Sequence, residues 1–184
     1  MTKSSVAMMS AMILVATVAG NAAEVTPQAT AAKAIGQLGQ EMRNKLTESM
    51  KKNGPAGSID VCAKDAPTII SRIEHEQGVT IKRTSLKVRN SQNVPDSVEQ
   101  ELLESLAALQ KAGGVLPSGV TVFPKSPKRF YKTITMEQAC LKCHGDATAI
   151  NEQVRKEITA TYPNDQAIGY KEGDFRGIIS VLVK

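Results

Sequence analysis

The spacing of apolar residues predicts two helices near the start of the chain. Thr26 and Pro27 open the first, because proline is favoured in the first turn of a helix, and Gly54 is suited to end it. Residues 58–76 repeat their apolar positions about every 3.6 residues, which indicates a second, amphipathic helix. Pro67 lies inside this helix and predicts a kink. Its apolar face consists of Ile59, Cys62, Ala66, Ile69, Ile70 and Ile73.

After Gly78 the apolar period changes to two, which is typical of a strand. Residues 79–83 alternate in one phase and residues 86–88 in the opposite phase. We therefore expect a strand that continues through a bulge near Thr84 and Ser85.

A third helix follows the polar turn at 89–96. Asp96 and Glu99 have the spacing of a capping arrangement, which predicts the start of the helix. It ends at the glycine pair 113–114. The expected apolar face consists of Val98, Leu102, Leu106 and Leu109.

The last third of the chain mixes strands and helices. Residues 120–135 predict two short strands around a Pro/Ser loop. Thr135 and Gln138 suggest a capping box for a helix that carries residues 140–144.

A further helix and a hairpin complete the pattern. The helix places Ile150, Val154 and Ile158 on one face, and the hairpin pairs 168–170 with 175–183. Strands enclosed by several helices predict the α+β class.

The N-terminal segment has the pattern of a secretory signal peptide. Lys3 precedes an apolar run from Val6 to Ala19 and then small residues, so we expect cleavage near Ala22 or Ala23. The run is shorter than the roughly 20 residues of a comfortable membrane span, and an uncleaved anchor is the alternative. We predict a signal peptide at 1–23, one domain at 24–184 and a periplasmic location.

The charge is mild and spread along the chain. Lysines and arginines number 23 against 18 acidic residues, a formal net charge of +5, which does not favour nucleic-acid binding. No later apolar stretch is long enough to cross a membrane.

One short motif carries candidate chemistry. Cys140, Cys143 and His144 form C-x-x-C-H in a chain with three cysteines and two histidines, a coincidence expected on the order of once in two thousand shuffled chains. Two thiols at this spacing can bond the two vinyl groups of one haem, and the histidine is then held beneath the iron. A zinc site needs about four ligands, and the sequence offers no second such pair. A redox dithiol needs no histidine at that position. The motif therefore predicts one covalent haem c.

The remaining thiol, Cys62, is a candidate for the other face of the iron. It lies on an expected buried helix face, and a metal keeps a thiolate deprotonated. A buried, inert cysteine is the alternative. His75 stands among charges at a helix end, and Met136 is too close to the motif to reach round the haem. Met42 and Met50, on the first helix, remain open as ligands.

The chain resembles the PAS-like, single-haem c-type family. The matching stretches are IDVCAKDAPTI, KRTSLKVRNSQNVPD, ACLKCHGD and TYPNDQAIGYKEGDFRGIISV, which together run from about residue 58 to the C-terminus. The resemblance implies a PAS-like antiparallel sheet with surrounding helices that enclose one covalent haem. It also implies His144 as the proximal ligand and Cys62 as the distal ligand.

Three arginines, Arg83, Arg89 and Arg176, fall in the matched stretches. A guanidinium suits a haem propionate, and a salt bridge within the fold is the alternative for each.

This ligand set predicts a haem of low potential, because thiolate donates charge to iron. A thiolate bond that weakens on reduction would open the iron to CO or NO, as in a redox or gas sensor that signals through a separate protein. A plain electron carrier would keep both ligands and need only a redox partner. A peroxidase-like enzyme needs an open distal site, so we do not expect an enzyme.

Overall fold

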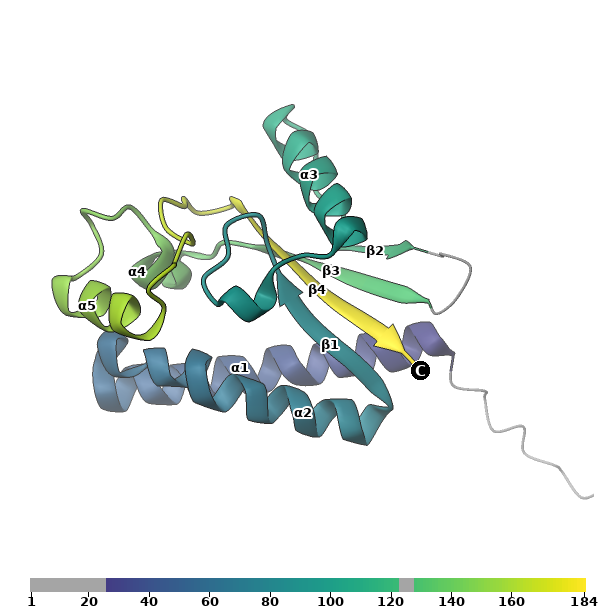
Figure 1. Ribbon diagram of the computed structural model, residues 1–184, viewed down its shortest axis with the longest axis horizontal. Helices are drawn as coiled ribbons and strands as arrows, with labels where there is room; N and C mark the ends of the chain where they lie inside the picture. The colour runs from purple at the N-terminus through teal and green to yellow at the C-terminus, as the bar shows by residue number, and fades with distance from the viewer. Residues whose placement is uncertain (1–25, 123–127) are drawn as a thin grey trace, which may run out of the picture.

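A four-stranded antiparallel sheet forms the centre of the fold. The structure, a computed structural model, describes residues 26–122 and 128–184; the expected signal peptide lies outside them. The strand order is β1-β4-β3-β2, so the first and last strands are neighbours (Figure 1). The strands are β1 (Val79–Thr84), β2 (Gly119–Val122), β3 (Arg129–Thr135) and β4 (Phe175–Val183).

Two helices cover one face of this sheet. The first, α1 (Pro27–Gly57), begins where the Thr26 hydroxyl accepts a hydrogen bond from the Ala29 N–H, and it runs beside α2 (Ala66–Gln77) (Figure 1). Gly54 has a φ of 68° and interrupts the helical backbone near the end of α1, where the sequence predicts the end. The core beneath consists of Ala31, Ala34, Leu38, Ile69, Ile73, Val79, Ile81, Phe130 and Val181.

The predicted kink in the second helix takes the form of a π-helical turn. Residues Val61–Asp65 form η1, in which the Ala66 N–H donates to the Val61 carbonyl, five residues back. Pro67 follows in the first turn of α2. Because proline has no N–H, the helix cannot keep its regular ladder across this point, and the register widens before it.

A single helix, α3 (Ser97–Lys111), covers the other face (Figure 1). The capping box of Asp96 and Glu99 is confirmed. The predicted apolar face is wrong at its ends, because Val98 and Leu109 are 38% and 40% exposed. The helix turns Glu99 inward instead, where its carboxylate accepts from Lys82 Nζ at 2.7 Å.

The strand after Gly78 ends earlier than predicted. It stops at Thr84, and residues 86–88 form no strand beyond it. Gly177, on β4, has a φ of 148°, and a Cβ there would lie 2.3 Å from the Thr84 carbonyl oxygen. The chain leaves the sheet at this close approach, so no bulge joins the two phases.

Two predictions for the last third are also wrong. Thr135 ends β3 opposite Phe175 and caps no helix, since pairing with β4 occupies it. Residues 168–170 are not a strand of a hairpin: the N–H groups of Gly169 and Tyr170 donate to carbonyls of 145 and 144.

Three helical elements lie beyond one end of the sheet (Figure 1). They are η3 (Gln138–Cys140), α4 (Leu141–His144) and α5 (Glu152–Thr161), and η2 (Ser91–Asn93) lies in the turn after β1. The α5 helix buries Val154 and Ile158 against the end of α1, as predicted. Ile150 joins the same cluster from the turn before the helix, which begins at Glu152 and not at 150. The α+β class is confirmed, and no helix in the described ranges is long and apolar enough to span a membrane.

Replacing Gly177 with alanine should destabilise the fold. We expect Gly177→Ala to lower the free energy of unfolding by about 2–4 kcal/mol, because the added Cβ meets backbone and the φ is unfavourable for alanine. Gly36→Ala is the matched control, since its Cβ meets nothing within 4 Å in α1, and it should gain about 0.5–1 kcal/mol. Urea unfolding measures both, and equal stabilities would contradict the prediction.

Candidate functional site

A short helical turn carries the C-x-x-C-H residues. Cys140 ends η3, and Cys143 and His144 lie in α4. Gly145 ends the turn with its N–H on the Leu141 carbonyl, and a Cβ at this position would lie 2.6 Å from that oxygen. Glycine therefore lets the backbone turn sharply directly after the histidine.

The two thiols of the motif lie in different apolar clusters. Cys143 packs beside the α5 cluster, and Cys140 packs beside Met136, Ala167 and Tyr170. Burial raises the pKa of the Cys143 thiol. Both cysteines are free thiols that are partly exposed.

The segment 165–170 holds the turn from the opposite side. The Gly169 N–H donates to the Gly145 carbonyl at 2.8 Å, and the Tyr170 N–H donates to the His144 carbonyl at 3.0 Å. His144 Nδ1 lies 2.7 Å from the Ala167 carbonyl oxygen. The Tyr170 ring meets the imidazole edge-on, with ring centres 6.4 Å apart.

The tautomer and the protonation state of His144 suit a metal ligand. A carbonyl oxygen can only accept, so Nδ1 carries the proton and Nε2 keeps its lone pair. Burial, together with the positive charges of Arg89 and Arg176, lowers the pKa of His144 to about 3. The neutral imidazole therefore persists at physiological pH, with Nε2 free of a competing proton.

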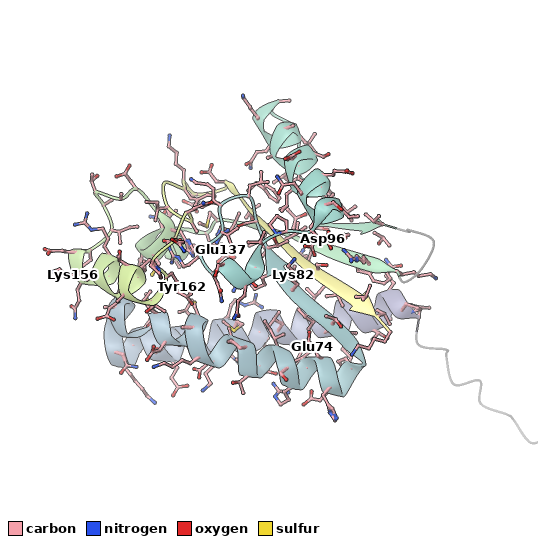
Figure 2. All side chains as sticks on the ribbon, viewed as in Figure 1. Glu74, Lys82, Asp96, Glu137, Lys156 and Tyr162 are labelled. Carbon is pink, nitrogen blue, oxygen red and sulfur yellow. The ribbon has the colours of Figure 1, made fainter. Side chains whose placement is uncertain are left out.

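Cys62 and His144 line the same cavity. Cys62 comes from η1, and the two residues are 82 positions apart in sequence, so the fold brings together the two predicted axial ligands. The apolar part of the wall consists of Val88, Ile134 and Tyr162. Tyr162, which is labelled in Figure 2, directly follows α5.

The cavity is narrow in this conformation. Its volume is about 90 Å³, below the roughly 300–1,000 Å³ of typical small-molecule sites. A large planar group enters only if lining side chains move outward.

All three predicted arginines line this cavity as well. Arg89 is held tightly: its Nε and Nη2 donate to the two carboxylate oxygens of Asp165 at 3.1 and 3.0 Å. The same Nη2 donates to the carbonyls of Cys143 and Ala167 at 2.6 and 3.2 Å. The salt-bridge alternative therefore describes Arg89 in this structure.

Arg176 and Arg83 are less fully partnered. Arg176 Nη1 donates to Ser85 Oγ at 2.6 Å, while its Nε is buried without a hydrogen-bond partner. Burial lowers the pKa of Arg176. The Arg83 side chain makes no hydrogen bond or ion pair with any residue in the described ranges. Three guanidinium groups thus border the cavity, and one carboxylate, Asp165, is paired with them.

The other candidate ligands lie elsewhere. His75 is exposed on α2, as the sequence predicts. Met136 is buried beside Tyr170, and Met42 packs against the core between α1 and the sheet. Neither these two nor Met50 lines the cavity of Cys62 and His144.

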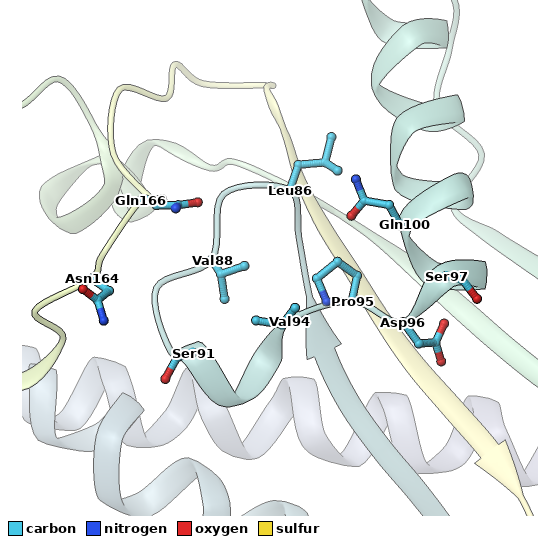
Figure 3. A pocket seen from close by; sticks show the side chains of 10 residues that line it. All are labelled: Leu86, Val88, Ser91, Val94, Pro95, Asp96, Ser97, Gln100, Asn164 and Gln166. Carbon is cyan, nitrogen blue, oxygen red and sulfur yellow. The ribbon is translucent and has the colours of Figure 1, made fainter.

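A wider hollow lies on the other side of the loop after β1. Its volume is about 540 Å³, and Figure 3 shows Val88 and Pro95 from the loop, Gln100 from α3, and Asn164 and Gln166 from the segment after α5. It is lined by no cysteine or histidine. The candidate chemistry therefore lies in the narrower cavity.

Sequence reasoning missed two groups at the site. The local sequence gives Asp165 no role at the site, yet its carboxylate pairs with Arg89 and also accepts from the Ala167 N–H at 2.8 Å. An acidic residue in a stretch that matches a haem family was the available signal. The carbonyl of Ala167 gives no signal in sequence, because every residue has one.

Comparison with known proteins places this geometry in a family. A model of the Tll0287-like family matches residues 21–184, which include Cys62 and the C-x-x-C-H turn. The crystal structure of the cyanobacterial heme-protein Tll0287 aligns with a TM-score of 0.67 at 20% sequence identity, over 86% of this chain and 96% of that chain. This likeness shows a shared fold. A search of curated proteins finds no match. Because the family model spans almost the whole sequence, the chain belongs to the Tll0287-like family.

Proposed function

We propose that this protein is an exported c-type haem protein with one haem of low potential, which acts in redox or gas sensing. Cys140 and Cys143 would bind the haem covalently, and His144 and Cys62 would be its axial ligands. The observation that carries the proposal is that Cys62 and His144 line one cavity although they are far apart in sequence. The name of the related structure, a heme-protein, supports the same cofactor.

The net positive charge of the residues around the cavity suits a haem. Three arginines border the space and only Asp165 is paired with them, so positive charge is in excess. A haem carries two propionates, and guanidinium groups bind carboxylates well. The buried, unpaired Nε of Arg176 is one donor for them, and the Arg83 side chain, which has no partner among the described residues, is another. Arg83 can also move outward and widen the cavity without losing a hydrogen bond.

The ligands determine what the site can do. Haem iron supplies a one-electron couple between Fe(III) and Fe(II). Cys62, as a thiolate, would donate charge and favour the oxidised state, which gives the low potential. His144 would bind through Nε2, oriented by its Nδ1–H on the Ala167 carbonyl.

Sensing is favoured over plain electron transfer by the thiolate ligand, because a carrier would keep both ligands in both oxidation states and a thiolate bond weakens on reduction. That ligand would be Cys62. It lies in the π-helical turn η1, and such turns are frequent at functional sites. Release of Cys62 on reduction would open one face of the iron to CO or NO. A sensor of this kind needs a separate signalling partner, and a carrier would need a redox partner.

The finer fold and location also belong to the proposal. A PAS-like relationship is supported by the antiparallel sheet, with first and last strands adjacent and helices on both faces. Export is supported by the signal-peptide pattern at 1–23, and we propose no enzymatic activity.

Removal of Cys62 should change the axial ligation and leave the haem attached. In Cys62→Ala and Cys62→Ser, we expect the low-spin thiolate EPR signal of the oxidised protein to disappear and the potential to rise, because iron loses a charge-donating ligand. The haem content should stay at the wild-type level. An unchanged oxidised spectrum would refute the assignment of Cys62.

Reduction of the wild-type protein in the presence of CO separates a sensor from an electron carrier. On reduction of the wild-type protein, we expect the thiolate signature to be lost and CO to bind. Absorption spectra with and without CO measure this. A six-coordinate reduced spectrum that ignores CO would instead identify an electron carrier.

Covalent attachment should depend on the two motif cysteines. Cys140→Ala with Cys143→Ala should leave any haem extractable by acidic organic solvent, whereas the wild-type haem stays with the polypeptide in a denaturing gel. Cys62→Ala is the control, because it removes the cysteine outside the motif and should keep the covalent haem. Extractable haem in the wild type would contradict the c-type assignment.

Export should remove the N-terminal segment. Mass spectrometry of the mature protein from the periplasmic fraction should find a chain that begins after Ala22 or Ala23. A mature chain that still contains Lys3 would contradict the cleavage.

A further inference from the structure

Arg89 connects three parts of the site that are distant in sequence. It lies in the loop after β1, yet it donates to Cys143 in the C-x-x-C-H turn and to Asp165 and Ala167 after α5. The Arg89 and Asp165 side chains are only 10% and 9% exposed, so this contact lies largely out of solvent. A buried bidentate pair of this kind has a defined geometry.

The carbonyl groups that accept hydrogen bonds from Arg89 lie next to His144 or contact it. The Cys143 carbonyl belongs to the residue before the histidine, and the Ala167 carbonyl is the group that accepts the Nδ1 proton of the imidazole. Asp165 holds the same segment, because its Oδ1 accepts from the Ala167 N–H. The Arg89 guanidinium therefore bonds both the backbone next to His144 and the Ala167 carbonyl, and so holds these two groups in position relative to each other.

The acceptor of a ligand histidine controls its chemistry. A hydrogen bond from the second ring nitrogen fixes the tautomer and the ring orientation, and it raises the basicity of the nitrogen that binds the metal. Movement of the Ala167 carbonyl therefore changes both the plane of the imidazole and its strength as a donor.

We propose that Arg89, held by Asp165, is the positioning residue for His144. Its Nε and Nη2 are engaged with protein acceptors, so only its Nη1 would be left for a propionate beside Arg83 and Arg176. This inference rests on the proposed role of His144 as an iron ligand, and it adds the group that orients that ligand.

The test compares Arg89→Gln with the wild-type holoprotein in the full chain. We expect the His144 Nδ1 proton to exchange with solvent about tenfold faster, because its hydrogen bond to Ala167 loses its support. We also expect broadened low-spin EPR lines, since the imidazole plane is no longer held in one orientation. NMR exchange and EPR of the oxidised protein measure these effects.

Arg129→Gln is the matched control. It also removes an arginine from an ion pair, with Asp96 at the start of α3, and Arg129 does not line the cavity. We expect it to lower the thermal midpoint while the exchange of the His144 proton and the EPR lines stay as in the wild type. If Arg89→Gln gives this same pattern, Arg89 has only a structural role and the inference is overturned.

Two further measurements keep the result interpretable. If Arg89→Gln does not fold, Asp165→Asn keeps the guanidinium and weakens its anchor, and faster exchange of the His144 proton is again expected. Wild-type exchange in Asp165→Asn would overturn the inference. If the wild-type chain holds no haem, the proposed function fails, whereas proton exchange in the same chain still tests the role of Arg89.

Discussion

The hydrogen bond between the His144 imidazole and the Ala167 carbonyl joins the two segments on which the site depends. It links the C-x-x-C-H turn to the segment after α5, and two backbone hydrogen bonds from Gly169 and Tyr170 run beside it. Because a carbonyl can only accept, this one contact determines which nitrogen carries the proton. Without it, the imidazole would have no defined tautomer or plane.

Partly buried positive charge is the second constraint. Three guanidinium groups border a narrow cavity and one carboxylate is paired with them, which is costly in the absence of a further anion. The structure responds in two ways: Arg89 is neutralised by Asp165, and Arg176 lies over the Tyr170 ring at 5.4 Å. Arg83 has neither kind of partner in the described ranges. The imbalance is the physical reason to expect a dianionic cofactor.

Three of the wrong predictions about the fold share one cause. The sequence pattern predicted a bulged strand through Ser85, a cap at Thr135 and a hairpin at 168–170, and in each case pairing with a distant segment prevailed. Gly177 meets Thr84 and Ser85, which precede it by 93 and 92 residues, and local periodicity carries no trace of that contact. Elements with strong local signals, such as the capping box of Asp96 and Glu99, were predicted correctly.

The sequence by itself determined the candidate ligands, because C-x-x-C-H is a local motif and Cys62 was the one thiol left outside it. It also determined the α+β class, since helical and strand periods are local properties. Only the tertiary structure decided that Cys62 lines the same cavity as His144, that the Ala167 carbonyl accepts the Nδ1 proton of His144, and that Arg89 donates to that same carbonyl. These depend on backbone groups and on contacts between segments far apart in the chain, which become neighbours only when burial of the apolar faces has brought the elements together.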